Sequence, residues 1–257
     1  MPKSKKKLPK ERQQIMKKIV LAIVAVGAIV LVAGHLAGNL NDEIKRKSDV
    51  FAREQVVKLV TDQGSCTGVE ITAPSGRVYT LTARHCKILI QDDHVAAITE
   101  DGQKHFLKVI SIDKNSDLML LQGVDGYEGV HVAKQNHKYE GIHSMTHGHG
   151  KPTYRTDGLL LDEEVVQVLM GFIHDADDQA KCLSTPSASA MESPFGTVCV
   201  MDLILTTTTA KIVPGSSGGP ILDAAGSLVG IASATDSEGM FSYLVRLSDI
   251  KDFLKGR

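Results

Sequence analysis

The sequence predicts an all-β domain that ends in a short helix and is preceded by a single transmembrane helix. Three observations predict this: a charge-free apolar run near the start, many short β-rich segments after it, and an amphipathic segment at the end. The chain has 257 residues, of which 42% are hydrophobic and 23% charged, an ordinary composition for a globular protein. Because Trp is absent and only 4% of residues are aromatic, we expect a core of Val, Leu, Ile and Ala.

The apolar run covers residues 19–40 and contains no Asp, Glu, Lys or Arg. As a helix it would be about 33 Å long, enough to cross a hydrocarbon core of about 30 Å. Residues 1–18 carry eight Lys/Arg against the single acid Glu11. The positive-inside rule therefore places the N-terminus in the cytosol and the main domain in the periplasm or outside the cell. A cleaved signal peptide is the alternative, but no good small-x-small cleavage site ends the run.

The chain is thus expected to have four segments. They are a basic cytosolic tail (1–18), a transmembrane anchor (19–40), a polar helical stalk (41–54) and a main domain (55–257). The main domain carries 17 Lys/Arg against 25 Asp/Glu. This acidic balance argues against nucleic-acid binding, which favours basic faces. Membrane contact is expected through residues 19–40.

Short β-rich segments separated by turn residues fill the main domain and predict a sandwich or barrel. The clearest of them cover residues 68–72, 78–83, 104–112, 118–123, 198–208, 228–234 and 241–246. Residues 175–197 are rich in Asp, Ser, Ala and Pro, and we expect a long surface loop there. A final helix is expected to have Ser248 as its N-cap and an apolar face made of Ile250, Phe253 and Leu254.

The chain has four cysteines: Cys66, Cys86, Cys182 and Cys199. An even number in an exported domain suggests two disulfides. A Cys182–Cys199 bridge would close the expected surface loop and stabilise the fold by about 3 kcal/mol on the loop-entropy model. Metal ligation by the cysteines is the alternative, but no CxxC or Cys–His spacing supports it.

Residues 215–220 read Gly-Ser-Ser-Gly-Gly-Pro and are the strongest functional pattern. A serine between glycines suits a nucleophile, because its small neighbours permit a tight turn and leave amides free to bind an oxyanion. A plain Gly/Ser turn is the alternative. A serine hydroxyl needs a histidine to accept its proton, and that histidine needs a carboxylate to orient it. His85 ends one β-like run and Asp117 opens another, so the order His85, Asp117, Ser217 predicts a catalytic triad.

These motifs resemble those of the trypsin/chymotrypsin family of serine proteases, closest to its bacterial HtrA-type branch. Thr-Ala-x-His-Cys at 82–86 resembles the family's histidine motif, and Asp-Leu-Met-Leu-Leu at 117–121 its aspartate strand. Residues 214–220 resemble the HtrA-type serine loop, and residues 226–233 the hairpin that lines the primary pocket. The resemblance covers residues 55–255 and implies two perpendicular β-barrels with the triad in the cleft between them.

The resemblance also implies the details of the site. It implies a Cys66–Cys86 disulfide and an oxyanion hole made by the amides of Gly215 and Ser217. It implies an endopeptidase acting on proteins or peptides without a cofactor or metal. We expect its activity to rise as His85 loses its proton, with a midpoint near the unperturbed pKa of about 6.5.

The substrate pocket is expected near Lys211, Ser233, Ala234 and Thr235. Lys211 lies six residues before Ser217, where the digestive members of the family place the base of the pocket. A lysine there would favour acidic substrate side chains; the alternative is that Lys211 points to solvent.

The sequence departs from the family in three places. Arg84 stands where a small residue is common, which changes the expected charge of the cleft. Ser216 stands where digestive members have an Asp that pairs with a cleaved N-terminus, so activation by that cleavage is not expected. HtrA-type enzymes usually carry a peptide-binding domain after the protease, and none is expected here, because the sequence ends at Arg257. Two hypotheses of other classes stay open. One is a catalytically silent trypsin-fold module that binds a partner, and the intact triad and glycine motif argue against it. The other, by analogy with the HtrA branch, is a chaperone-like quality-control protein, which the expected lack of a peptide-binding domain disfavours. The oligomeric state is unspecified.

Other assignments of the chemistry are weaker. The α/β-hydrolase order needs a histidine after the serine, but the last histidine is His174. Asp62 would serve a subtilisin order, with little around it to suggest a motif, and Asp113 is an alternative triad aspartate that precedes polar residues rather than an apolar strand. A metal site is a further alternative, which would be made by four histidines: His137, His143, His147 and His149. The last two are instead expected in a surface turn over residues 147–150.

Overall fold

The computed structural model describes residue 43 and residues 46–62, 64–148 and 153–257. The chain divides into two units, Met1–Lys47 and Ser48–Arg257. Residues 46–54 are helical, and Ala52 is fully buried in the core, so the second unit includes the end of the segment expected as a stalk. The expected anchor, residues 19–40, lies outside the described residues. In the part of the chain that the structure describes, no helix is long and apolar enough to span a membrane.

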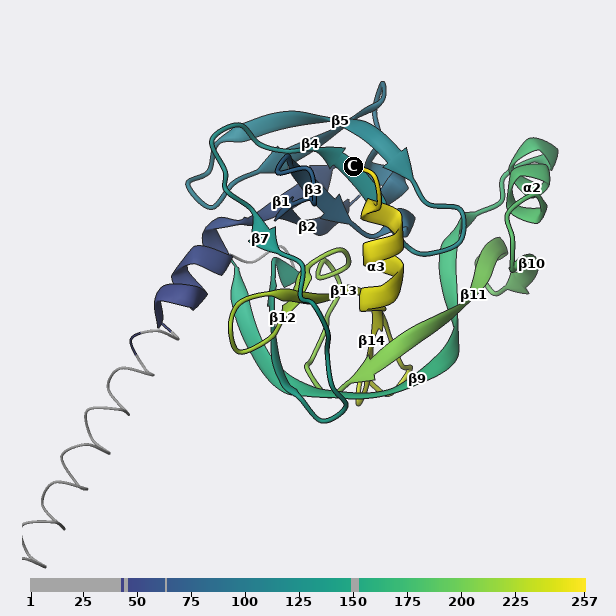
Figure 1. Cartoon of the computed structure of the whole chain (residues 1–257). Helices are drawn as coiled ribbons and strands as arrows, with labels where there is room; N and C mark the ends of the chain where they lie inside the picture. Colours follow the sequence, from purple (N-terminus) through teal and green to yellow (C-terminus); the bar gives the residue numbers. More distant parts are fainter. Residues whose placement is uncertain (1–42, 44–45, 63, 149–152) are drawn as a thin grey trace, which may run out of the picture. The chain divides into compact units, whose positions relative to one another are not determined.

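The first half of the Ser48–Arg257 unit forms a β-barrel (Figure 1). Its strands are β1 (Val56–Thr61), β2 (Gly64–Thr72), β3 (Val78–Thr82), β4 (His94–Ile98), β5 (Lys104–Ile112), β6 (Met119–Gln122) and β7 (Val130–His131). They hydrogen-bond in the order β1-β4-β5-β6-β3-β2, and β1 also pairs with β2, which closes the ring. β7 lies outside the ring, parallel to β2. A 3-10 helix, η1 (Arg84–Leu89), follows β3 directly.

The second half forms another barrel. Its strands are β8 (Gly141–Thr146), β9 (Tyr154–Phe172), β10 (Ala188–Ser193), β11 (Gly196–Thr208), β12 (Pro220–Leu222), β13 (Leu228–Thr235) and β14 (Ser242–Val245). The order β11-β14-β13-β12-β8-β9 closes through pairing of β9 with β11, and β10 pairs outside the ring with β11. All seven strands expected from the sequence are present, because their alternating or continuous apolar residues match the buried faces of the two barrels.

Among the described residues, three apolar clusters form the core. One lies in the first barrel around Leu59, Leu107 and Leu121, and another in the second around Ile212 and Val229. The third and largest cluster combines residues of both halves, so it packs the barrels against each other. This interface between the barrels is where the predicted catalytic residues meet.

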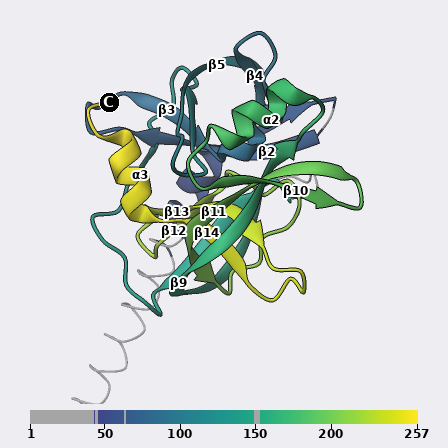
Figure 2. The same cartoon turned by 90° about the vertical axis from the view of Figure 1, so that its right-hand side faces the viewer.

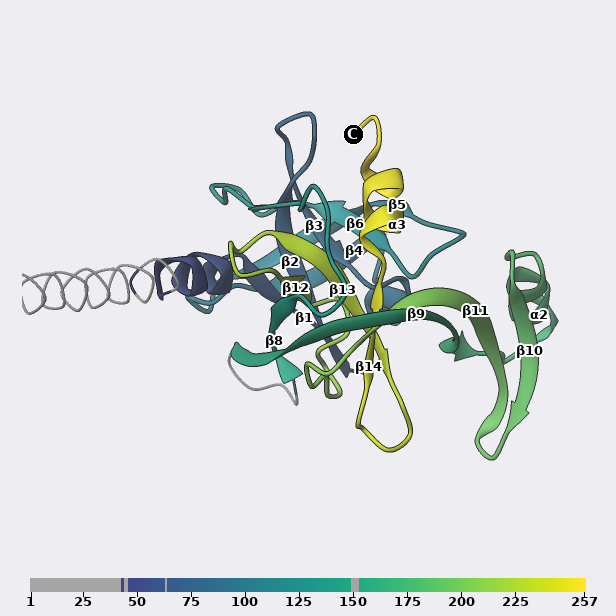
Figure 3. The same cartoon turned by 60° about the horizontal axis from the view of Figure 1, so that its bottom comes forward.

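The expected surface loop over 175–197 is wrong in part. The segment contains α2 (Ala176–Leu183) and β10, which stand at the far end of the long strands β9 and β11 (Figure 3). The Asp175 side chain caps α2 by accepting a hydrogen bond from the Asp178 amide at 2.8 Å. Acidic residues in the first turn of α2 add to this, since they complement the helix dipole. A short capped helix thus forms within a stretch whose composition suggested a loop.

The C-terminal helix, α3 (Leu247–Leu254), packs beside the second barrel (Figures 1 and 2). As expected, Ile250 and Leu254 are buried and Phe253 is partly buried. The expected N-cap is wrong: the helix begins one residue before Ser248, with Arg246 at the cap and no side-chain cap bond. Arg246 instead pairs with Asp249 in the first turn at 2.7 Å.

Candidate active site

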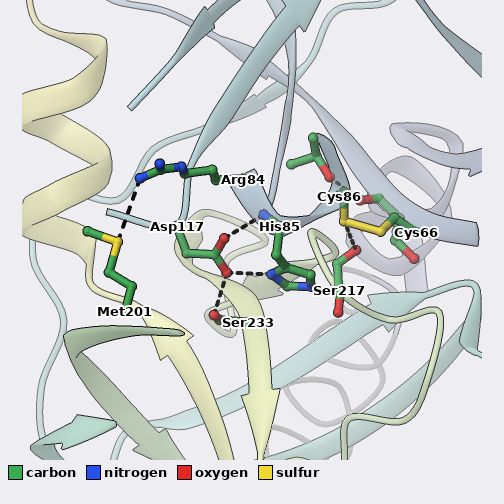
Figure 4. Close-up of polar contacts among 10 residues, drawn as sticks. Cys66, Arg84, His85, Cys86, Asp117, Met201, Ser217 and Ser233 are labelled. Atoms are coloured by element: carbon green, nitrogen blue, oxygen red, sulfur yellow. Dashed lines mark hydrogen bonds and ion pairs between the residues drawn. A yellow bond between two sulfur atoms is a disulfide. The ribbon is translucent and has the colours of Figure 1, made fainter. Parts of the chain in front are cut away.

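The predicted catalytic residues come from both barrels. His85 lies in η1 and Asp117 lies two residues before the start of β6, both in the first barrel. Ser217 lies in the loop between β11 and β12 of the second barrel. In Figure 4, His85 lies between the Asp117 carboxylate and Ser217. The fold thus assembles three residues that are far apart in the sequence at the junction of the barrels.

The Asp117 carboxylate is fully buried and accepts three hydrogen bonds. Its Oδ2 lies 2.8 Å from His85 Nδ1, and its Oδ1 accepts from the His85 backbone amide at 2.9 Å. Ser233 Oγ also donates to Oδ2, at 2.5 Å. Because Nδ1 faces a carboxylate, it carries the proton in the neutral ring, and Nε2 is left as an acceptor.

The two partners shift each other's pKa. Burial alone would lower the pKa of His85, but the charge and hydrogen bond of Asp117 outweigh burial, and the pKa is raised. Burial would likewise raise the pKa of Asp117, but His85 and the hydrogen bonds from His85 and Ser233 lower it. An ionised carboxylate therefore stands behind the imidazole, where it stabilises an imidazolium.

The loop that carries Ser217 is fastened to β2. The Ser217 carbonyl accepts from the Thr67 amide at 2.8 Å, and the Gly215 carbonyl accepts from Thr67 Oγ1 at 2.8 Å. Gly218 has a φ of 84°, and a Cβ there would overlap Thr82 Oγ1 and the Thr67 carbonyl. A side chain at this position would therefore push the loop away from the first barrel. Among the described residues, no hydrogen bond joins His85 to Ser217.

The turn before Ser217 orients two backbone amides. The Ser216 amide donates to the Val213 carbonyl at 2.9 Å, and Gly215 has a φ of 90°. With a proline second and a glycine third, this is a type II turn. Within the described chain, neither the Gly215 amide nor the Ser217 amide donates a hydrogen bond, whereas the amides of Ser216 and Gly218 do. The two amides expected to form an oxyanion hole are therefore available to a ligand.

Ser216 is fully buried under this loop. Its Oγ lies 2.9 Å from Thr146 Oγ1 and 3.4 Å from the Tyr154 hydroxyl, and it accepts from the Val213 amide at 3.4 Å. A neutral hydroxyl network therefore supports the loop at the position where the resemblance to digestive proteases would place an ion pair. This arrangement needs no cleaved N-terminus.

The structure contains both expected disulfides. Cys66–Cys86 joins β2 to η1, so it holds the segment that carries His85, and the Cys86 sulfur lies 3.8 Å from the Ser217 carbonyl oxygen. Cys182–Cys199 joins α2 to β11.

The four residues expected around the substrate pocket differ in their burial and in their contacts. Lys211 is exposed, and its carbonyl accepts from Thr156 Oγ1 at 3.0 Å. Ser233 is buried and directed to Asp117, whereas Ala234 is half-buried and Thr235 exposed at the end of β13. The contact of Ser233 with Asp117 is a role the sequence did not indicate. No local pattern reports it, because the two residues are 116 positions apart.

The alternative residues have other partners. Asp113 accepts hydrogen bonds from the Asn115 amide and the Ser116 hydroxyl, within its own turn. The surface turn expected at His147 is wrong, because His147 is buried and its amide donates to Thr67 Oγ1. His149 lies outside the described residues. Within the described ranges, no group of three or more His, Cys, Asp or Glu side chains could hold a metal ion.

Comparisons with known proteins agree with this architecture. The sequence profile of the trypsin-like peptidase domain matches residues 64–231. No curated protein matches the chain. Among solved structures, the inactive form of the Rv3671c protease from M. tuberculosis is 14% identical, with a TM-score of 0.57 over 80% of this chain and 89% of that one.

Two further structures have the same fold. The HtrA-type protease AlgW with a tripeptide is 17% identical, with a TM-score of 0.58 over 82% of this chain and 64% of that chain. A serine endoprotease from Yersinia pestis is 14% identical, with a TM-score of 0.56 over 83% and 68%. The profile match spans more than half of the chain, and its range includes His85, Asp117 and Ser217. The chain therefore belongs to the family of trypsin-like peptidase domains, which are serine proteases.

Proposed function

We propose that this protein is a membrane-anchored serine endopeptidase with His85, Asp117 and Ser217 as its catalytic triad. The observation that carries the proposal is the pairing of His85 with a buried carboxylate beside a serine loop whose two amides have no partner in the described chain. Its substrates would be proteins or peptides.

The geometry supports a conventional acyl-transfer mechanism. Ser217 Oγ attacks the scissile carbonyl while His85 Nε2 accepts its proton, and the same proton then goes to the leaving amine. Water attacks the resulting acyl-enzyme by the same route and restores Ser217. Asp117 stays ionised and holds the ring. The amides of Gly215 and Ser217 stabilise the negative oxygen of each tetrahedral intermediate, and one such donor is typically worth about 3 kcal/mol.

Labelling with a fluorophosphonate probe tests the activated serine. The full-length chain, purified in a mild non-ionic detergent, is treated with the probe and the adduct is mapped by mass spectrometry. We expect an adduct at Ser217 that is lost in Ser217→Ala and His85→Ala, while the exposed Ser75→Ala variant is labelled like the parent. Absence of labelling in a chain with a cooperative thermal transition would favour the silent binding module.

The proposed topology places residues 1–18 in the cytosol and residues 55–257 in the periplasm or outside the cell, with residues 19–40 crossing the membrane. The charge-free run and the lysine-rich tail before it support this orientation. A reporter that folds only outside the cytosol, fused after Arg257, is expected to be active. Activity of a cytosol-only reporter at the same position would contradict the topology.

A further inference from the structure

A cavity of about 230 Å³ is lined by residues of η1, of α2, of the end of β9 and of the start of β11. Two of its lining residues, Arg84 and Lys87, come from η1, and Lys181 and Asp178 come from α2. Met170, Phe172 and the Cys182–Cys199 disulfide supply an apolar wall. We call this space the cationic cavity. Its lining includes Arg84, the residue before His85, but not His85, Asp117 or Ser217.

Positive charge dominates the cationic cavity. Three cations face one carboxylate, and the only close pair is Lys181 with Asp178, at 3.9 Å, among the residues the structure describes. In the same described ranges, no carboxylate oxygen lies within 4.0 Å of a side-chain nitrogen of Arg84 or Lys87. The cavity therefore has a net positive charge that the protein itself does not neutralise by contact.

Arg84 is the most unusual member of this set, because it is only 8% exposed. Its terminal nitrogens donate to neutral acceptors: the Lys114 carbonyl at 3.2 Å, Thr185 Oγ1 at 3.4 Å and the Met201 sulfur at 3.6 Å. Its buried Nε has no hydrogen-bond partner. In Figure 4 the side chain extends away from the His85–Asp117 pair, toward Met201.

A buried guanidinium without a contacting carboxylate is costly, since it has lost water and gained only weak acceptors. Burial lowers the pKa of Arg84, although the charges of Asp117 and Asp113 oppose this, and burial together with the charge of Arg84 lowers the pKa of Lys87. An anion in the cavity would offset the cost of burying the Arg84 guanidinium, and it would favour the charged forms of Arg84 and Lys87. Arginine is well suited to receive it, because its fork of donors matches the two oxygens of a carboxylate.

We propose that the cationic cavity is a binding site for an acidic peptide segment, with Arg84, Lys87 and Lys181 facing a carboxylate of the peptide. The apolar wall favours a peptide over a free inorganic anion, because the methylenes of a glutamate side chain would cover Met170 and Phe172, and a hydrated phosphate would not. The proposal does not depend on Ser217 acting as a nucleophile.

Calorimetric titration of the full-length Ser217→Ala chain in detergent tests the site without any turnover. The probes are acetylated and amidated tetraglutamate and tetraglutamine peptides, at constant ionic strength. We expect tetraglutamate to bind and tetraglutamine to bind at least about tenfold more weakly. Lys87→Gln and Lys181→Gln should each weaken tetraglutamate binding by about threefold to fivefold. The matched control is Lys108→Gln, an exposed lysine on β5, which should bind like the parent.

Three results would overturn the proposal. They are equal binding of the two peptides, tetraglutamate binding that neither lysine substitution weakens, and binding of inorganic phosphate by a chain that does not bind tetraglutamate. The last result would make the cavity a simple anion site. Arg84→Gln should abolish binding if its melting temperature stays near that of the parent. The exposed lysine variants decide the question if Arg84→Gln does not fold.

Discussion

Ser233 Oγ donates a 2.5 Å hydrogen bond to Asp117 Oδ2, the same oxygen that faces His85 Nδ1. Ser233 lies in β13 of the second barrel and Asp117 beside β6 of the first, so the bond crosses the junction of the two barrels. A buried carboxylate needs such donors to stay ionised. Ser233 is therefore a positioning residue for the proposed triad.

Replacing Ser233 by alanine removes a hydrogen bond to a charged group, which is typically worth about 1.5–3 kcal/mol. We expect the second-order rate constant of fluorophosphonate labelling to fall about tenfold, which corresponds to about 1.4 kcal/mol of activation free energy. Ser75→Ala, at an exposed turn, is the control and should label at the parental rate. An unchanged rate in Ser233→Ala would show that His85 and its backbone amide alone hold Asp117 in place.

The pH dependence of labelling follows from the pair His85 and Asp117. Reaction needs neutral His85, and Asp117 raises the pKa of that histidine. The labelling rate should therefore rise with pH to a midpoint above the ordinary value of about 6.5, and so above the midpoint expected from the sequence alone. Asp117→Asn removes the effect that raises the pKa and leaves burial, which lowers it. Its midpoint should move down, and its rate should fall by roughly ten-thousandfold. A midpoint that does not move would exclude Asp117 as the partner of His85.

Loss of one disulfide should affect both stability and labelling, whereas loss of the other should affect mainly stability. Each closes a short loop, with sequence separations of 20 for Cys66–Cys86 and 17 for Cys182–Cys199, so each is expected to stabilise the fold by about 3 kcal/mol. Cys66–Cys86 also holds η1, which carries His85. We therefore expect Cys66→Ser/Cys86→Ser to lower both the free energy of unfolding and the labelling rate. Cys182→Ser/Cys199→Ser should lower mainly the free energy of unfolding in urea. Equal loss of labelling in both double variants would contradict this division.

The sequence could predict the strands and the order of the proposed triad because those signals are local. Apolar runs with flanking turn residues mark the strands, and glycines around Ser217 mark a tight loop. The helix α2 was missed although Asp175 and Asp178 form a capping pattern, because the Ser- and Ala-rich composition around it suggested a loop. The Cys182–Cys199 bridge was expected, but only as the closure of a loop, and in the structure it joins α2 to β11.

The remaining features depend on packing between segments far apart in the sequence. The contact of Ser233 with Asp117 forms only when the two barrels meet. The same is true of the cationic cavity, where Arg84 is buried by residues of β11 and the turn after α2. Arg84 looked like a change of charge near the cleft, but its donors turn to the Lys114 carbonyl, Thr185 and Met201. No periodicity or spacing encodes these neighbours.

A last prediction concerns Glu70, a fully buried carboxyl on β2 of the first barrel. Its Oε1 accepts from Thr80 Oγ1 at 2.5 Å and its Oε2 accepts from the Val124 amide at 3.1 Å. Burial raises the pKa of Glu70 to about 7, and these two hydrogen bonds only partly oppose the rise. The folded chain therefore favours the protonated acid more than the unfolded chain does.

This difference makes the contribution of Glu70 to stability depend on pH. It is fully present below the pKa of the unfolded chain, near 4.5, and is lost as pH rises through about 7. Between pH 4 and pH 8 we expect this residue to lower the free energy of unfolding by about 3 kcal/mol. Glu70→Gln, which cannot ionise, should remove that part of the pH dependence in urea unfolding curves, whereas the exposed Glu238→Gln should keep it. A Glu70→Gln chain that loses stability with pH as steeply as the parent would mean that the carboxyl is already ionised in the fold, with Thr80 and Val124 supplying enough compensation to keep its pKa low.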